Sequence, residues 1–365
     1  MAHVVTQGAG RQWAAQTAGL AAQTAGLAGH PAGRSGARVW AAALAALLAA
    51  LAWGAPPARA AEDDIVPGGV WLLRAAVTQE TQRDAIATDG QRRPLVDYLA
   101  QQPGLAGRLS GDVVRHVTAT ETLIGYGISD TWSLNLSVPY RVIRQESSLG
   151  AAAGDPAAGG AADLLKRRTV SGLGNLRWTS LHRPLFTDTD GIVLGWGVAT
   201  PGGPQQMDYA GRTTLATRVP YQALTGLFHY THYLLSVNRA RLDLRFTFDL
   251  AYDTYVNTPT ASHVLLDPPN AGTGSVRWEQ EFETFGYGLF LWHESTTQTF
   301  LGGHSQQDMT KETRLGAQFT YGNLSRLEEH PIAFPYQAGL QIDHLMSGFN
   351  VPESSRYTLF LRTYF

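Results

Sequence analysis

The sequence of 365 residues contains no cysteine. This absence excludes disulfide bonds, thiolate metal sites and a cysteine nucleophile. Charged residues are also scarce, at 16% of the chain, whereas a typical soluble domain has about 25%. Beyond residue 60 there is no run of 18 or more apolar residues, so no transmembrane helix is expected there. Segments with the 3.6-residue periodicity of an amphipathic helix are rare as well.

The first sixty residues have the pattern of a secretory signal peptide with a long n-region. Arg34 and Arg38 precede an apolar run, Val39–Trp53, that is too short to span a bilayer. Small residues around Ala60 then form a cleavage site, and an uncleaved N-terminal anchor helix is the less favoured alternative. Cleavage after about Ala60 removes four arginines and no acidic residue, which leaves an acidic chain. We therefore expect no nucleic-acid partner, because such a partner requires a basic surface.

The rest of the chain alternates apolar and polar residues in segments of about ten residues. In Arg241–Asp253, for example, leucine, phenylalanine and tyrosine occupy every second position and mainly polar residues lie between them. Trp132–Tyr140, Thr313–Tyr321 and Tyr336–His344 follow the same rule. A period of two residues predicts β-strands with one apolar and one polar face.

The connections between the predicted strands favour a barrel over a soluble sandwich. We predict twelve strands, near residues 69–80, 115–128, 131–144, 170–183, 191–200, 220–236, 241–256, 275–292, 295–302, 312–321, 334–345 and 356–365. Long loops are expected at 81–114, 145–169, 201–219, 257–274, 303–311 and 346–355. Shorter turns are expected near 129–130, 183–190, 238–239, 293–294 and 322–333. Short turns at one end and long loops at the other are typical of outer-membrane barrels, which close so that no strand edge is unpaired in lipid.

The predicted fold is therefore all-β: a transmembrane antiparallel up-and-down β-barrel over residues 61–365, with a disordered extracellular loop at about 145–169. The expected location is the outer membrane of a Gram-negative cell. The expected partners are outer-membrane lipid, a small-molecule permeant, and the barrel-assembly machinery acting on the last strand, which ends in Phe365.

Three segments together resemble a known family. They are GISDTWSLNLSVPY at 127–140, SGLGNLRWTSLHRP at 171–184 and GIVLGWGVATPGG at 191–203. In this order they resemble the Gram-negative outer-membrane proteins called MetA-pathway of phenol degradation, sharply over about 121–203 and as a strand pattern to Phe365. The resemblance implies a barrel of about this strand number and the passage of aromatic or other hydrophobic compounds. It supplies no catalytic residues.

Two features depart from that family, and they leave the substrate open. One is the low-complexity loop at 150–165, and the other is the acidic strand around Glu279–Glu283. Counting every second position places Glu279, Glu281 and Glu283 on the same face as the apolar residues from Phe285 onward. The polar face therefore switches within this predicted strand. We expect the first half to extend beyond the membrane on the extracellular side, with a bulge near Gly286 as the alternative.

Strand parity directs nine charged side chains into the lumen. Facing lipid instead, an arginine or lysine at the bilayer midplane costs about 2–4 kcal/mol. The predicted lumen residues are Arg141, Arg177, Asp243, Arg245, Asp249, Asp253, Arg314, Asp343 and Arg362. They fit either a polar path whose charges set selectivity or salt bridges that fill the barrel. Twelve strands lie between the filled 8-stranded barrels and the open 16-stranded porins, and we favour a narrow or partly plugged pore.

The sequence favours no catalytic residues, metal site or cofactor. His229 and His232 lie three apart in a predicted strand, so they point to opposite faces and cannot share an ion. No G-x-S-x-G nucleophile motif occurs. The predicted function is therefore passage of small compounds, including hydrophobic or aromatic ones, and not an enzyme activity. An outer-membrane enzyme acting on lipid or peptide, and a non-conducting structural or adhesive barrel, remain as alternatives.

Overall fold

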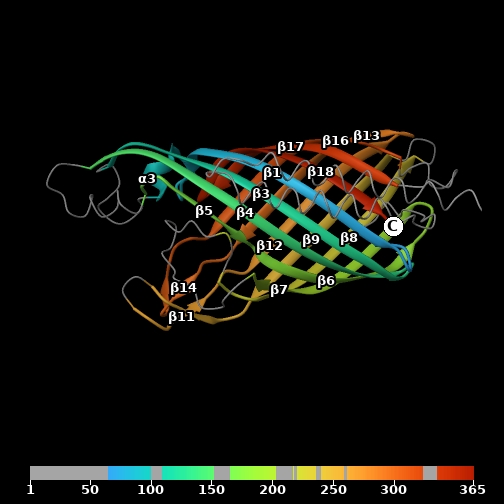
Figure 1. Ribbon diagram of the computed structural model, residues 1–365, viewed down its shortest axis with the longest axis horizontal. Helices are drawn as coiled ribbons and strands as arrows, with labels where there is room; N and C mark the ends of the chain where they lie inside the picture. Colours follow the sequence, from blue (N-terminus) through green and yellow to red (C-terminus); the bar gives the residue numbers. More distant parts are fainter. Residues whose placement is uncertain are drawn as a thin grey trace, which may run out of the picture.

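The computed structural model describes residues 65–99, 109–151, 165–202, 217, 220–235, 240–258, 261–323 and 335–365. Residues 1–60, where the signal peptide is predicted, lie outside this part of the chain. The described residues form a closed antiparallel barrel with twelve strand positions (Figure 1). The prediction of an up-and-down β-barrel of twelve strands is confirmed.

The barrel strands follow one another around the wall in chain order. They are β1 (Trp71–Ile86), β3 (Leu109–Ser129), β4 (Trp132–Ala151), β5 (Arg168–Leu173) with β6 (Asn175–Phe186), β7 (Asp190–Pro201), β8 (Ala223–Leu235), β9 (Ala240–Ala251), β12 (Ala271–Glu281), β13 (Phe285–Thr296), β16 (Thr310–Gly322), β17 (Tyr336–Phe349) and β18 (Val351–Tyr364). β5 and β6 both pair with β4, so they form one strand that is interrupted at Gly174. β18 pairs with β1 and closes the ring.

The two ends of the barrel differ in their connections. Most of the short turns lie at the end where the C-terminus is found, which we call the turn end (Figure 1, right). Long connections occur at the opposite end, the loop end, and carry most of the additional structure: β2 (Arg92–Pro94), α3 (Leu95–Leu99), β10 (Thr254–Val256), β11 (Val264–Asp267), β14 (Phe300–Leu301) and β15 (His304–Ser305). In outer-membrane barrels the short turns are periplasmic and the long loops extracellular. No helix among the described residues is long and apolar enough to cross a membrane.

Two predicted connections are wrong. The segment 275–292 is not one strand, because β12 ends at Glu281 and β13 begins at Phe285. Phe282 and Phe285 close this turn with a backbone hydrogen bond of 2.7 Å, and their rings stack. The predicted turn at 293–294 therefore lies within β13. The predicted long loop at 346–355 is a tight turn at Asn350, whose φ of 61° lies in the left-handed region that asparagine tolerates.

The loop expected at 145–169 is shorter than predicted. β4 continues to Ala151 and β5 begins at Arg168, so both ends of that range are strand. Residues 152–164 lie outside the described part of the chain.

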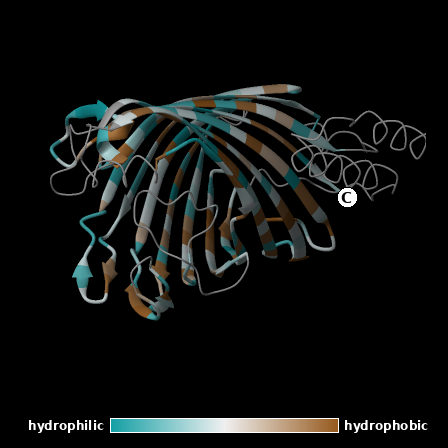
Figure 2. Cartoon of the chain, turned by 60° about the vertical axis from the view of Figure 1, so that its left-hand side comes forward, coloured by the Kyte–Doolittle hydropathy of each residue, from teal (hydrophilic) through white to brown (hydrophobic). Residues whose placement is uncertain are grey.

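The outer and inner faces of the wall have opposite polarity, as the alternation predicts. Trp132 and Leu134 on β4 are 44% and 45% exposed, whereas Ser133 and Asn135 between them are buried towards the lumen. Leu359 on β18 is 62% exposed on the outer face. Figure 2 shows apolar and polar residues alternating along the strands. Because large apolar side chains do not face water in such numbers, this outer surface is a lipid-facing one.

Candidate functional site: the barrel lumen

The barrel encloses a cavity of about 1080 Å³ with a polar, arginine-rich lining. Among the described residues, nine arginines and four carboxylate side chains line it. The arginines are Arg74, Arg141, Arg177, Arg241, Arg245, Arg277, Arg314, Arg356 and Arg362, and the carboxylates are Glu121, Asp249, Glu279 and Asp343. Arginine is favoured for binding carboxylates and phosphates, because its planar fork donates two parallel hydrogen bonds.

Seven of the nine predicted lumen residues line this cavity: Arg141, Arg177, Arg245, Asp249, Arg314, Asp343 and Arg362. Asp243 is buried in the wall, where it accepts a hydrogen bond of 2.8 Å from Thr231. The structure does not place Asp253 in the lumen. β9 ends at Ala251, so the alternation stops there and Asp253 lies exposed in the connection to β10.

Sequence reasoning missed other lining residues for identifiable reasons. Arg277 and Glu279 were missed because 275–292 was predicted as a single strand. The alternation directs their side chains into the lumen only if the strand ends at Glu281, as it does in the structure. Arg356 is the first residue of the predicted last strand, whereas the observed strand begins at Val351 and places Arg356 well inside the wall. Arg74 shares the inner face of β1 with apolar Leu72 and Ala76, so the alternation there carried no signal.

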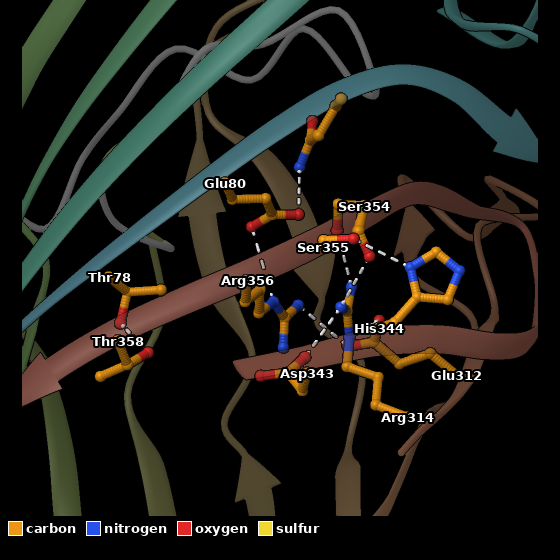
Figure 3. A network of polar contacts seen from close by, with 11 residues as sticks. Thr78, Glu80, Glu312, Arg314, Asp343, His344, Ser354, Ser355, Arg356 and Thr358 are labelled. Carbon is orange, nitrogen blue, oxygen red and sulfur yellow. Dashed lines mark hydrogen bonds and ion pairs between the residues drawn. The ribbon is translucent and has the colours of Figure 1, made fainter. Parts of the chain in front are cut away.

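A network of buried ion pairs occupies the wall in the loop-end half (Figure 3). Arg314, with a side chain only 1% exposed, places Nη1 3.0 Å from Asp343 Oδ1 and Nε 3.1 Å from Glu312 Oε2. Its Nη2 also lies 2.9 Å from the hydroxyl of Ser354. Arg356 lies 3.3 Å from Glu312, and 3.5 Å from Glu80 on β1. The network therefore connects β16, β17, β18 and β1.

A second group of charges lies in the turn-end half. Arg241 on β9 forms an ion pair of 2.8 Å with Glu279 on β12, and Gln318 donates to the other oxygen of this carboxylate at 3.1 Å. Glu281 accepts a hydrogen bond from Gln337 at 3.5 Å. The expected extracellular extension of this acidic strand is wrong, because the parity change comes from the turn at 282–284. Glu279 and Glu281 are lumen residues near the periplasmic end.

The lumen ion pairs run along the wall. Arg177 on β6 reaches Asp249 on β9 at 2.7 Å, and the pairs of Arg241, Arg314 and Arg356 join nearer strands. These partners are one to three positions apart in a ring of twelve, whereas opposite walls are six apart. None of these pairs joins opposite walls of the barrel.

The chain ahead of β1 narrows the turn-end mouth. Ile65 is fully buried against Leu181 and Val193, which belong to β6 and β7. Gly69 N donates to Gly127 O at 2.8 Å, so the segment Ile65–Val70 continues to the inner side of β3. A Cβ at Gly127 would lie 1.8 Å from the carbonyl oxygen of Pro67. This close approach requires glycine.

The loop end is partly covered by α3. Its apolar side chains pack with Ala85, Val113 and Leu165 in a small core. The hydroxyl of Tyr98 donates to the carbonyl oxygen of Asn350 at 2.8 Å, which ties α3 to the tight turn between β17 and β18.

The two histidines on β8 have separate partners. His229 Nε2 lies 3.3 Å from Asp243 and 3.3 Å from the hydroxyl of Thr231, and His232 Nδ1 lies 2.9 Å from Asp190. In a catalytic triad the nucleophile and the carboxylate contact different ring nitrogens. In the His229 group the same nitrogen faces both, so this arrangement does not fit nucleophilic catalysis.

The fold is similar to solved outer-membrane channel structures. An outer-membrane channel from Pseudomonas putida F1 superposes with a TM-score of 0.60 at 15% identity, over 84% of this chain and 99% of that one. The NanC porin (TM-score 0.41, 8% identity, 79% and 98% coverage) and the CymD monoaromatic hydrocarbon channel (0.37, 8%, 82% and 88%) are less similar. No family model and no curated protein matches the sequence.

The chain thus has the fold of a Gram-negative outer-membrane β-barrel. This fold and the apolar outer face place it in the outer membrane.

Proposed function

We propose that this barrel is a channel for the passage of small molecules across the outer membrane. The observation that carries the proposal is the cavity of about 1080 Å³ inside the barrel. The ion pairs around it join nearby strands of the wall and not opposite walls. A barrel built only as a scaffold would gain more stability from charges or apolar groups that fill its centre. The proposed partners are outer-membrane lipid, a small-molecule permeant, and the assembly machinery that acts on the strand ending in Phe365.

The finer proposal is that the permeants include aromatic or other hydrophobic compounds. The resemblance to the MetA-pathway family supports it, and so do three of the five aromatic side chains in the lining, Phe290, Trp292 and Phe360. The guanidinium groups of Arg277, Arg356 and Arg74 lie 5.7, 5.4 and 5.4 Å from the centres of these rings, respectively. An aromatic ring beside a guanidinium offers both an apolar and a cationic contact.

Planar-bilayer recording of the refolded, signal-free protein tests the channel. We expect discrete conductance steps, and slower uptake of small aromatic compounds in a deletion strain. Absence of both conductance and an uptake defect would refute the channel and favour a structural or adhesive barrel. We further propose that the barrel acts without catalysis, and lipase or protease activity that is lost when His229 or His232 is replaced would contradict this.

A further inference from the structure

Two residues of opposite charge stand on opposite walls of the lumen. Arg141 lies on β4 and Glu294 on β13, and these strands are six positions apart in the ring of twelve. Arg141 lines the cavity. Glu294 is two and four residues beyond Trp292 and Phe290, which also line it, so the alternation of the strand places all three on the inner face of β13.

Both residues lie near the loop end of the lipid-facing band. The outward residues are apolar up to Val142 on β4 and up to Leu291 on β13, and charged or polar beyond these points. Glu294 and Arg141 interact electrostatically. Within the described residues they form no ion pair or hydrogen bond with each other or with any other side chain. The two charges therefore act on one another across a gap in the lumen.

The wall around Glu294 does not compensate its charge by contact. Its register partner on β16 is Glu312, and like charges in opposed positions are destabilising. Arg314 and Arg356 are bound to Glu312, at 3.1 and 3.3 Å (Figure 3). Arg356 attracts Glu294 from a distance, but Glu312 and Asp249 repel it. A cationic group in the lumen would therefore be stabilised beside Glu294.

Arg141 has the complementary requirement. Its side chain is exposed to the cavity. Its register partners, Ala119 on β3 and Gly172 on β5, carry no charge. Glu121, two residues along β3, accepts a hydrogen bond of 2.6 Å from Ser137 and forms no ion pair with Arg141. An anionic group in the lumen would therefore be stabilised beside Arg141.

An aromatic ring lies next to Glu294 on the same wall. Trp292 lines the cavity, and the guanidinium of Arg356 lies 5.4 Å from the centre of its ring. Alternate residues of a strand are about 6.8 Å apart. A small molecule whose own ring packs against Trp292 can therefore place a charged group beside Glu294.

We propose that Glu294 and Arg141 bind a small aromatic zwitterion, with its ammonium group at Glu294, its carboxylate at Arg141 and its ring against Trp292. The inference rests on the proposed channel function and deepens it by naming a class of permeant. One zwitterion supplies a charge-assisted hydrogen bond to each wall. A simple cation or anion compensates one wall and leaves the other charge without a partner.

Calorimetry on the detergent-solubilised, signal-free barrel tests this site without requiring conduction. The probes are phenylalanine, phenethylamine, which lacks the carboxylate, and 3-phenylpropionate, which lacks the ammonium group. A hydrogen bond to a charged group contributes about 1.5–3 kcal/mol, and about 1.4 kcal/mol is a factor of ten in affinity. We therefore expect phenylalanine to bind about tenfold more tightly, or better, than either of the other two probes.

Two variants separate charge recognition from a loss of structure. E294Q and R141Q should each weaken phenylalanine binding about tenfold or more. E294Q should leave 3-phenylpropionate binding unchanged, and R141Q should leave phenethylamine binding unchanged, because each variant keeps the residue that the respective probe contacts. E294Q should fold as well as the parent protein, since it removes one of two opposed like charges, and the retarded gel mobility of the unheated barrel checks both variants.

The matched controls are R144Q and E146Q. Arg144 and Glu146 form an exposed ion pair of 2.7 Å on the outward-facing positions of β4, so neither substitution should change the binding of phenylalanine. These variants alter the same two charge types on the same barrel, outside the lumen. An equal effect of E146Q and E294Q, or of R144Q and R141Q, would overturn the site.

The remaining outcomes separate this site from the channel. Phenylalanine binding no tighter than that of the two single-charge probes, a loss in only one of E294Q and R141Q, or no binding by the parent barrel would each overturn the zwitterion site. If the barrel conducts and does not bind phenylalanine, the channel stands and the site is refuted. If it binds phenylalanine through both residues without conducting, the site stands and the channel is refuted.

Discussion

Arg314 is expected to be the most costly lumen arginine to remove. Its side chain is 1% exposed and contacts Asp343, Glu312 and Ser354. In Arg314→Met the methionine side chain fills the space of the aliphatic part of the arginine. Asp343, whose side chain is 7% exposed, nevertheless loses its direct cationic partner. Glu312 keeps Arg356 at 3.3 Å. Breaking a buried ion pair by removing one partner costs about 3–5 kcal/mol, and we expect R314M to lower the free energy of unfolding by this amount.

The assay is urea unfolding of the barrel in lipid vesicles, followed by tryptophan fluorescence. The control is Arg144→Met, which breaks the ion pair with Glu146 where the two side chains are 53% and 43% exposed. An exposed pair contributes at most about 1 kcal/mol. Adding Asp343→Asn to R314M removes the orphaned charge and should recover part of the loss, so the two substitutions are non-additive. The reasoning would be refuted if R314M cost no more than R144M, or if D343N destabilised both backgrounds equally.

Three further predictions concern the mouth, the outer face and the lumen charges. Gly127→Ala should displace the segment ahead of β1 and raise single-channel conductance, because the added Cβ would collide with the backbone of that segment. In the control Gly191→Ala the nearest atom to the added Cβ is 3.7 Å away, so the conductance should not change. Leu359→Arg, on the outer face, should destabilise the barrel by about 2–4 kcal/mol in urea unfolding, and unchanged stability would argue against a lipid-facing position. Asp249→Asn should shift the reversal potential in a salt gradient towards anion selectivity, because it removes the ion-pair partner of Arg177. Asp253→Asn should cause no such shift. Equal shifts would contradict the placement of Asp253 outside the lumen.

The strand pattern was predictable because the side-chain period of a strand is a local property. An apolar residue at every second position predicts correctly which side chains of β4 and β9 face outward. This prediction needs no information about the neighbouring strands. The same rule placed seven charged residues on the cavity lining. It failed at Asp253, where no sequence signal marked the end of β9, and at the turn between β12 and β13. That turn contains neither glycine, proline nor asparagine, and it is held by the stacked rings of Phe282 and Phe285.

The sequence by itself determined which face of each strand meets lipid and which meets the lumen. Only the tertiary structure decided which lumen residues are neighbours, because the register between strands depends on how the whole sheet closes. Arg74 and Arg362 stand near opposite ends of the described chain and become partners only when β18 pairs with β1. The network around Arg314 likewise needs four strands in register. Alternation is a property of single strands, whereas an opposed pair of arginines exists only in the closed barrel.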